Sequence, residues 1–124
     1  MIDHVSIPVR DLAGAAEFYE AVLATLGYAK LETRPATVAF GKRYSEFWLN
    51  HRPDLMPPPG GNGAHIALRA SSRDMVDSFH ATALARGGIS DGAPGLRPQH
   101  GESYYAAYFS DPDGNRIEAV TFLA

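Results

Sequence analysis

The residues Asp111-Pro112-Asp113-Gly114-Asn115-Arg116-Ile117-Glu118 form the most informative segment of this chain. Pro112 fixes φ and Gly114 accepts a positive φ without a Cβ clash, so the segment predicts a tight hairpin turn. Residues 116–122 are largely apolar and β-branched, which is typical of a strand. Glu118 interrupts this run. A carboxylate in a half-buried strand costs several kcal/mol unless something positive meets it, so Glu118 requires a partner: a cation, an arginine or a metal.

Length and composition limit what that partner can be. The 124 residues are 45% hydrophobic, which predicts one domain, residues 1–124, that buries about two thirds of its unfolded surface. The chain has no cysteine, which excludes disulfides, thiolate catalysis and cysteine-type zinc sites. A net charge of −3 without a basic stripe argues against a nucleic-acid partner. No charged leader and no apolar run approaching 18 residues is present, so we expect a cytoplasmic protein without a membrane partner.

The first part of the chain predicts a strand, a helix and three further strands. Residues 2–9 alternate between apolar and polar positions, as in a strand with one buried face. Asp11 is a good helix cap, and Gly27 ends the apolar stripe that follows it. The three further strand candidates are residues 28–33, 36–41 and 45–51. Residues 53–63, rich in proline and glycine, predict a connector.

The second part repeats the first at an offset of 61 residues. His65 then corresponds to His4, and the same offset relates Phe18 to Phe79, Leu23 to Leu84, Ala24 to Ala85 and Gly27 to Gly88. These ungapped coincidences indicate an internal duplication.

The duplicated half also predicts a helix, capped by Ser71 or Ser72 and ended by Gly87-Gly88. Residues 89–100 are expected to be irregular because they are rich in glycine and proline. Residues 104–109 and 116–122 are expected to pair as a hairpin through the turn at Asp111.

This order of elements, with Asp3-His4-Val5, His65-Ile66-Ala67-Leu68 and the 111–118 segment, resembles the vicinal oxygen chelate superfamily of glyoxalases, bleomycin-resistance proteins and extradiol dioxygenases. The resemblance covers essentially the whole chain. It implies an α+β fold of two tandem βαβββ modules that form a curved mixed β-sheet cup with the helices outside. The modules would span about residues 1–52 and 64–124, joined by the connector 53–63.

The resemblance also implies a metal site, because the positions that match the family's ligands are His4, His65 and Glu118. Two imidazoles and one carboxylate suit a divalent ion such as Zn, Ni, Mn or Fe(II) and leave positions open for a bidentate oxygen substrate. A histidine in a strand is otherwise commonly a structural residue. Glu118 has alternative partners in three arginines of the chain: Arg69, Arg97 and Arg116.

The sequence departs from glyoxalase I at the position of that enzyme's fourth metal ligand. The corresponding strand carries Trp48 and Asn50 on one face, with Glu46 near its start, and no strong anionic ligand at the matching position. The proton-transfer base of a standard glyoxalase reaction is therefore in doubt. The substrate-binding candidates are Trp48, Asn50, Tyr104 and Tyr108. Arg97 and His100 are weaker candidates for holding an anionic group or transferring a proton.

Two functions follow from these residues. The first is a metal-dependent enzyme of the lyase or isomerase, thiol-transferase or dioxygenase type, acting on a small molecule with adjacent oxygens. The second is a metal-free protein that binds or sequesters a small molecule in the same cup. We expect a homodimer, because an open cup leaves apolar surface exposed. By resemblance, His4 of one subunit would join His65 and Glu118 of the other.

Overall fold

The computed structural model describes all 124 residues and consists of two helices and eight strands in the order of two βαβββ units. The first unit contains β1 (Val5–Val9), α1 (Leu12–Ala24), β2 (Ala29–Thr33), β3 (Thr37–Gly41) and β4 (Phe47–His51). The second unit contains β5 (Ile66–Arg69), α2 (Arg73–Ala85), β6 (Ile89–Leu96), β7 (Tyr105–Ser110) and β8 (Arg116–Thr121).

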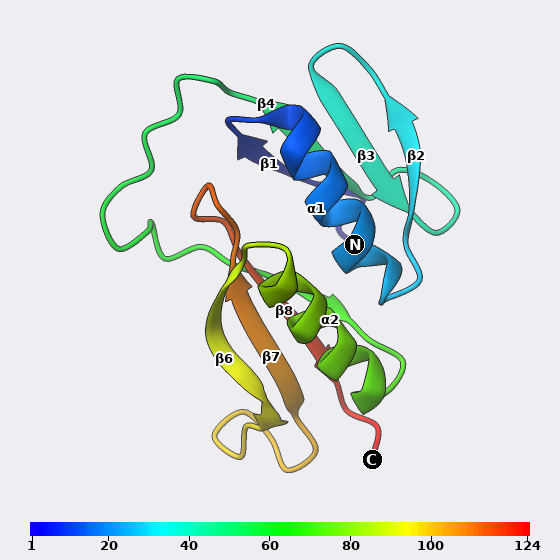
Figure 1. Cartoon of the computed structure of the whole chain (residues 1–124). Coiled ribbons are helices and arrows are strands. Elements are labelled where there is room, and N and C mark those ends of the chain that lie inside the picture. Colours follow the sequence, from blue (N-terminus) through cyan, green and yellow to red (C-terminus); the bar gives the residue numbers. More distant parts are fainter.

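Each unit folds into one four-stranded mixed sheet with its helix on one face (Figure 1). The strand orders are β1-β4-β3-β2 and β5-β8-β7-β6, so the first strand of each unit pairs in parallel with the last. A parallel pair needs a long crossover connection, and the helix and hairpin between the two strands supply it. The α+β class and the βαβββ order predicted from the sequence are confirmed.

Both helices begin at the predicted caps. The Asp11 carboxylate accepts a hydrogen bond from the Gly14 backbone N–H at 3.1 Å, and the Ser72 hydroxyl accepts one from the Met75 N–H at 3.2 Å. α1 and α2 each have 13 residues and start at positions 12 and 73, which differ by 61. The duplication inferred from the offset is therefore present in the structure.

The turn at residues 111–115 is also as predicted. Gly114 has a φ of +84°, its N–H donates to the Asp111 carbonyl at 3.0 Å, and the Asp111 N–H donates to the Asn115 carbonyl at 2.9 Å. The turn joins β7 to β8 in an antiparallel pair that aligns Tyr108 with Glu118. The hairpin therefore places this carboxylate in the central part of the second sheet.

The expectation of an irregular segment at residues 89–100 is wrong for its first eight residues, which form β6. The strand pairs with β7 through two register shifts, one between Ser90 and Gly92 and one between Gly92 and Gly95. The glycines interrupt regular pairing without preventing it, because bulges absorb the extra residues. Residues 97–100 lie beyond the strand, as expected.

One cluster of buried side chains extends through both units. The Phe18 ring of α1 packs edge-on against Phe109 of β7 at a centroid distance of 5.5 Å. The two helices lie on the same side of the sheets in Figure 1. Neither helix is long and apolar enough to cross a membrane.

A polar contact accompanies this apolar one. The Tyr19 hydroxyl donates to the buried Asp111 carboxylate at 2.6 Å, and the Asn115 amide donates both to Asp111 and to the Pro8 carbonyl at 2.9 Å. Burial raises the pKa of Tyr19 well above its usual value, and the Asp111 charge raises it further. The turn before the last strand is therefore attached to the first unit through the buried pair Tyr19 and Asp111 and through the partly buried Asn115.

Candidate functional site

Glu118 occupies the middle of the second sheet and is almost completely buried. Its strand, β8, lies between β5 and β7, where Glu118 is aligned with Ala67 on one side and with Tyr108 on the other. Only 1% of the residue is exposed. A carboxylate at this depth loses much of its hydration, so its hydrogen-bond partners determine what it can do.

Two side chains hold Glu118. The His65 Nε2 atom lies 3.0 Å from Oε1, and the Tyr104 hydroxyl donates a hydrogen bond to Oε2. Arg69, Arg97 and Arg116 do not pair with it: Arg116 lies 3.7 Å from Asp91, and Arg97 contacts backbone carbonyls. The arginine alternative for Glu118 is therefore not the arrangement within the chain. An imidazole and a phenol take its place.

The two tyrosines predicted near the site both adjoin this carboxylate. Burial raises the pKa of Tyr104 above its usual value, and the hydrogen bond to Glu118 raises it further. The pKa of Tyr108 is also raised, first by burial and then by the negative charge of Glu118. Both phenols therefore stay protonated to well above neutral pH and can donate hydrogen bonds.

His4 does not join His65 and Glu118 within the chain. It precedes β1, is exposed, and places Nδ1 2.8 Å from the Asp3 carboxylate. No group of three or more histidine, aspartate and glutamate side chains suited to a metal ion comes together in the single chain. One chain therefore brings two of the three predicted ligands into contact.

The predicted residues of the first sheet lie on β4. Trp48 is half-buried, with the Arg34 guanidinium 5.0 Å from its ring centre. The Asn50 amide donates to the Ser6 hydroxyl, which leaves the amide oxygen without a protein donor. Glu46 lies outside the strand, and its carboxylate accepts from the Lys42 N–H at 3.1 Å. β4 thus offers the Asn50 amide oxygen and the Trp48 ring to a ligand. The Glu46 carboxylate is instead bonded to the backbone of the preceding turn.

Arg97 and His100 surround the tyrosines without touching Glu118. The Arg97 guanidinium lies 5.4 Å from the Tyr108 ring centre and donates to the carbonyls of Ala93 and Gly95 at 2.6 and 2.9 Å. The His100 ring lies 5.2 Å from that of Tyr104. Arg97 is thus committed to its own loop, and His100 is the freer of the two.

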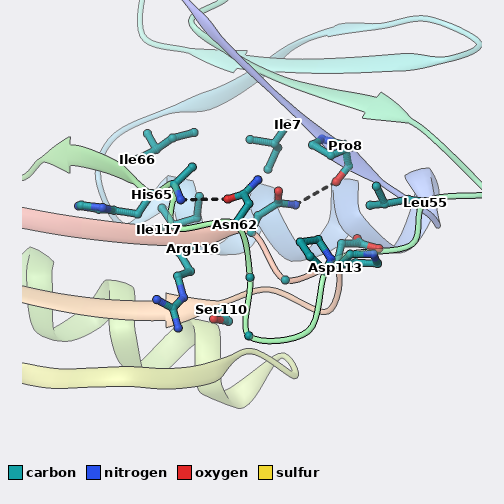
Figure 2. Close-up of a pocket in the computed structure, with 17 residues that line it drawn as sticks. Ile7, Pro8, Leu55, Asn62, His65, Ile66, Ser110, Asp113, Arg116 and Ile117 are labelled. Atoms are coloured by element: carbon teal, nitrogen blue, oxygen red, sulfur yellow. Dashed lines mark hydrogen bonds between the residues drawn. The ribbon is translucent and has the colours of Figure 1, made fainter.

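A hollow of about 400 Å³ borders the site on the side of the connector (Figure 2). It is lined by the connector, by Ile7 and Pro8 of β1, and by His65, Ile66 and Ile117 of the second unit. A smaller hollow of about 280 Å³ lies between His65, Tyr108 and Arg116. His65 borders both, so its ring is accessible from two sides while Glu118 stays buried behind it.

Sequence reasoning did not identify two neighbours of the site. Asp3 orients the imidazole of His4, and the adjacent carboxylate in Asp3-His4 was an available signal. Phe122 follows β8, and its ring meets that of Tyr104 edge-on at 5.3 Å. The period of two from Glu118 to Phe122 places both on one face, which makes Phe122 recognisable in retrospect.

Comparison with known proteins agrees with this architecture. The sequence model of the Glyoxalase/Bleomycin resistance protein/Dioxygenase superfamily matches residues 1–119. A glyoxalase/bleomycin resistance protein from Albidiferax ferrireducens T118 superimposes with a TM-score of 0.83 at 31% identity, covering 95% of each chain. None of the curated proteins compared with the chain matches it in sequence.

More distant structures share the fold alone. A glyoxalase/bleomycin resistance protein/dioxygenase family enzyme from Burkholderia phytofirmans PsJN has a TM-score of 0.75 at 19% identity, covering 98% of each chain. The fosfomycin resistance protein FosX from Listeria monocytogenes has a TM-score of 0.71 at 18% identity, covering 97% of this chain and 91% of that one. The chain belongs to the Glyoxalase/Bleomycin resistance protein/Dioxygenase superfamily.

Proposed function

We propose that this protein is a divalent-metal-dependent enzyme that acts on a small molecule with two adjacent oxygen atoms. The metal would be held by His65 and Glu118 of one subunit and by His4 of a second copy. The observation that carries the proposal is Glu118 itself: a carboxylate only 1% exposed, 3.0 Å from an imidazole nitrogen and paired with no arginine. Imidazole and carboxylate donors that already lie together suit a divalent first-row metal.

The immediate surroundings of the pair support a ligand role. The Tyr104 hydroxyl fixes one oxygen of Glu118, which leaves Oε1 directed at the imidazole of His65. Partners that orient a ligating carboxylate raise metal affinity by limiting its motion. A bound divalent ion would supply the positive charge that Glu118 lacks and would stabilise negative charge that develops on a substrate oxygen.

The position of His4 favours a site shared between two copies. Its ring is exposed, and the contact with Asp3 engages Nδ1, so Nε2 remains free to bind outside its own chain. A carboxylate that holds one imidazole nitrogen is a common arrangement for a metal-binding histidine. We therefore propose a homodimer in which each site takes His4 from the opposite subunit.

The first sheet indicates which reactions fit least well. Asn50 offers only an amide oxygen, and Glu46 is engaged by the Lys42 backbone N–H. No carboxylate of β4 is thus available as a fourth anionic ligand or as the base of a glyoxalase-type proton transfer. Three protein ligands favour a thiol-transferase or dioxygenase type of reaction.

Metal content tests the proposal. The protein is expressed in four separate cultures, supplemented with Mn, Fe, Ni or Zn. After purification from at least one of them it is expected to retain about one ion per chain. Glu118→Gln, His65→Ala and His4→Ala should each lose most of it, because each removes one ligand. His51→Ala is the matched control, since His51 lies at the end of β4 away from Glu118 and should keep the ion. Wild-type protein that holds no metal under all four conditions would instead support a metal-free binding protein.

A further inference from the structure

Arg69, the last residue of β5, is a cation without a polar partner in the chain. Its guanidinium lies 5.0 Å from the centre of the Phe122 ring and makes no hydrogen bond or ion pair with another side chain. The other arginines around the candidate site are engaged: Arg34 with Glu32, Arg97 with backbone carbonyls, and Arg116 with Asp91. Arg69 therefore has all of its donors available.

Arg69 also lies on the face of the sheet that carries Glu118. Ala67 is aligned with Glu118, and Arg69, two residues further along β5, projects from the same face. Two residues along a strand span about 6.6 Å, which is the separation of Arg69 from Ala67 along β5. The side chains of this face that lie next to the guanidinium and the carboxylate are both small: Ala67, which is exposed, and Val120, which is 6% exposed and aligned with Arg69.

Two aromatic rings in contact lie beside these residues. Phe122 lies under Arg69, the Tyr104 ring meets Phe122 edge-on at 5.3 Å, and the Tyr104 hydroxyl reaches Glu118. Phe122 is 44% exposed although it is large and apolar. An exposed ring beside a free guanidinium suits a ligand with a flat apolar body and a negative charge at one end.

We propose that Arg69 binds the anionic group of a flat, carboxylate-bearing small molecule, whose body lies against Phe122 and Tyr104. The other end of this molecule would reach the half-exposed His65 beside Glu118, and only this placement rests on the proposed function. The ligand class is thus a planar organic acid of about the size of a substituted benzoate. Arg69 is a specificity-determining residue in this arrangement, because it selects the charged end.

Benzoate and benzamide test the proposal, because they have the same size and shape and differ in charge. We expect wild-type protein, titrated with each and followed by two-dimensional NMR, to bind benzoate roughly fivefold or more tightly. The net charge of −3 would by itself disfavour benzoate, so general electrostatics cannot produce this preference. Arg69→Gln should abolish the preference and leave benzamide binding unchanged. Equal affinities in the wild type, or a preference that survives in Arg69→Gln, would overturn the proposal.

Arg73→Gln is the matched control. Arg73 lies on α2 and also stacks on an aromatic ring, that of Tyr105, at 4.9 Å, but away from Glu118. This variant should keep the benzoate preference. Loss of the preference in Arg73→Gln to the same extent as in Arg69→Gln would contradict a specific role for Arg69.

Metal content of the same preparations separates this inference from the proposed function. Arg69→Gln should retain as much metal as the wild type, because Arg69 is not a proposed ligand. The protein could bind no metal and still show a benzoate preference that depends on Arg69. That result would support the anion site and refute only the metal-dependent function. Metal binding without any benzoate preference would refute only the anion site.

Discussion

Glu118 is a buried carboxylate held between the His65 imidazole and the Tyr104 hydroxyl. A charged residue in a predicted buried strand pointed to a partner, and the duplication placed His65 and His4 at equivalent positions. The structure brings His65 to 3.0 Å from Glu118 because β5 and β8 are parallel neighbours, and the repeated order of elements made that pairing predictable. The hydrogen bond from Tyr104 was not predictable in detail, because Tyr104 lies before β7 and its direction depends on a loop.

Tyr104→Phe is predicted to lower the free energy of unfolding of the metal-free protein by about 1 to 2 kcal/mol, since it removes a donor from a buried carboxylate. Urea unfolding in the presence of a chelator measures the change. Tyr105→Phe is the control, because its hydroxyl binds Asp77 at the exposed surface, and it should cost less than about 0.5 kcal/mol. Equal losses in the two variants would show that Glu118 does not depend on Tyr104.

A second single residue, His80, is expected to make the stability of the protein depend on pH. Burial on α2 lowers its pKa below the usual value, and Nε2 lies 2.7 Å from the Ser90 hydroxyl. The unfolded chain therefore binds the proton more readily, so this contribution to stability is present above about pH 6.5 and is lost as the pH falls. The stability of the wild type relative to His80→Gln should decrease as the pH falls below about 6.5, as measured by urea unfolding. A constant difference would contradict a lowered pKa.

At the scale of the elements, turn and cap chemistry was a better guide than composition. Asp11, Ser72 and Gly114 perform the local roles that their residue types predict. The strand β6 was missed because glycine and proline weaken strand propensity. Gly92 has a packing reason: an added Cβ would lie 2.9 Å from the Tyr108 ring. The glycine that argued against a strand is thus what lets this strand approach the site.

Gly41 gives the sharpest prediction about an element. It ends β3 where the chain turns toward β4, and an added Cβ would lie 1.8 Å from the Tyr44 carbonyl oxygen. Gly41→Ala must move backbone, so it should destabilise the protein by more than about 2 kcal/mol. Gly87→Ala is the comparison: φ is +102° but the space is open, and about 1 kcal/mol is expected. Thermal or urea unfolding checks the order, and a smaller loss for Gly41→Ala would contradict it.

The two units of the whole molecule are joined by Phe18 and Phe109 in the core and by the polar cluster of the 111–115 turn. The sequence identified the turn but not its attachment, because contacts with Tyr19 and Pro8 bridge about a hundred residues and follow from tertiary packing. How two copies pair is likewise absent from local patterns. His4 lies apart from His65 and Glu118 of its own chain, and this separation is the structural feature that suggests pairing with a second copy.

Asn115→Ala tests the attachment between the units. It leaves the Pro8 carbonyl and one Asp111 oxygen with one donor fewer, so the free energy of unfolding should fall by about 1 to 3 kcal/mol. Asn62→Ala is the control, because Asn62 bonds only within the exposed connector and should change stability by less than about 0.5 kcal/mol. Urea unfolding of both variants measures the difference, and similar values would argue against the cluster as a structural joint.

The central claim, a metal ion shared between His65 and Glu118 of one subunit and His4 of another, is tested most directly by mixing two variants that each lack one proposed ligand. His4→Ala and Glu118→Ala should each bind almost no metal alone. After unfolding, mixing and refolding, a dimer with one chain of each kind regains one complete site, so metal content should rise to about one quarter of an ion per chain. Mixtures that bind no more metal than the separate variants, although they form mixed dimers, would contradict the shared site.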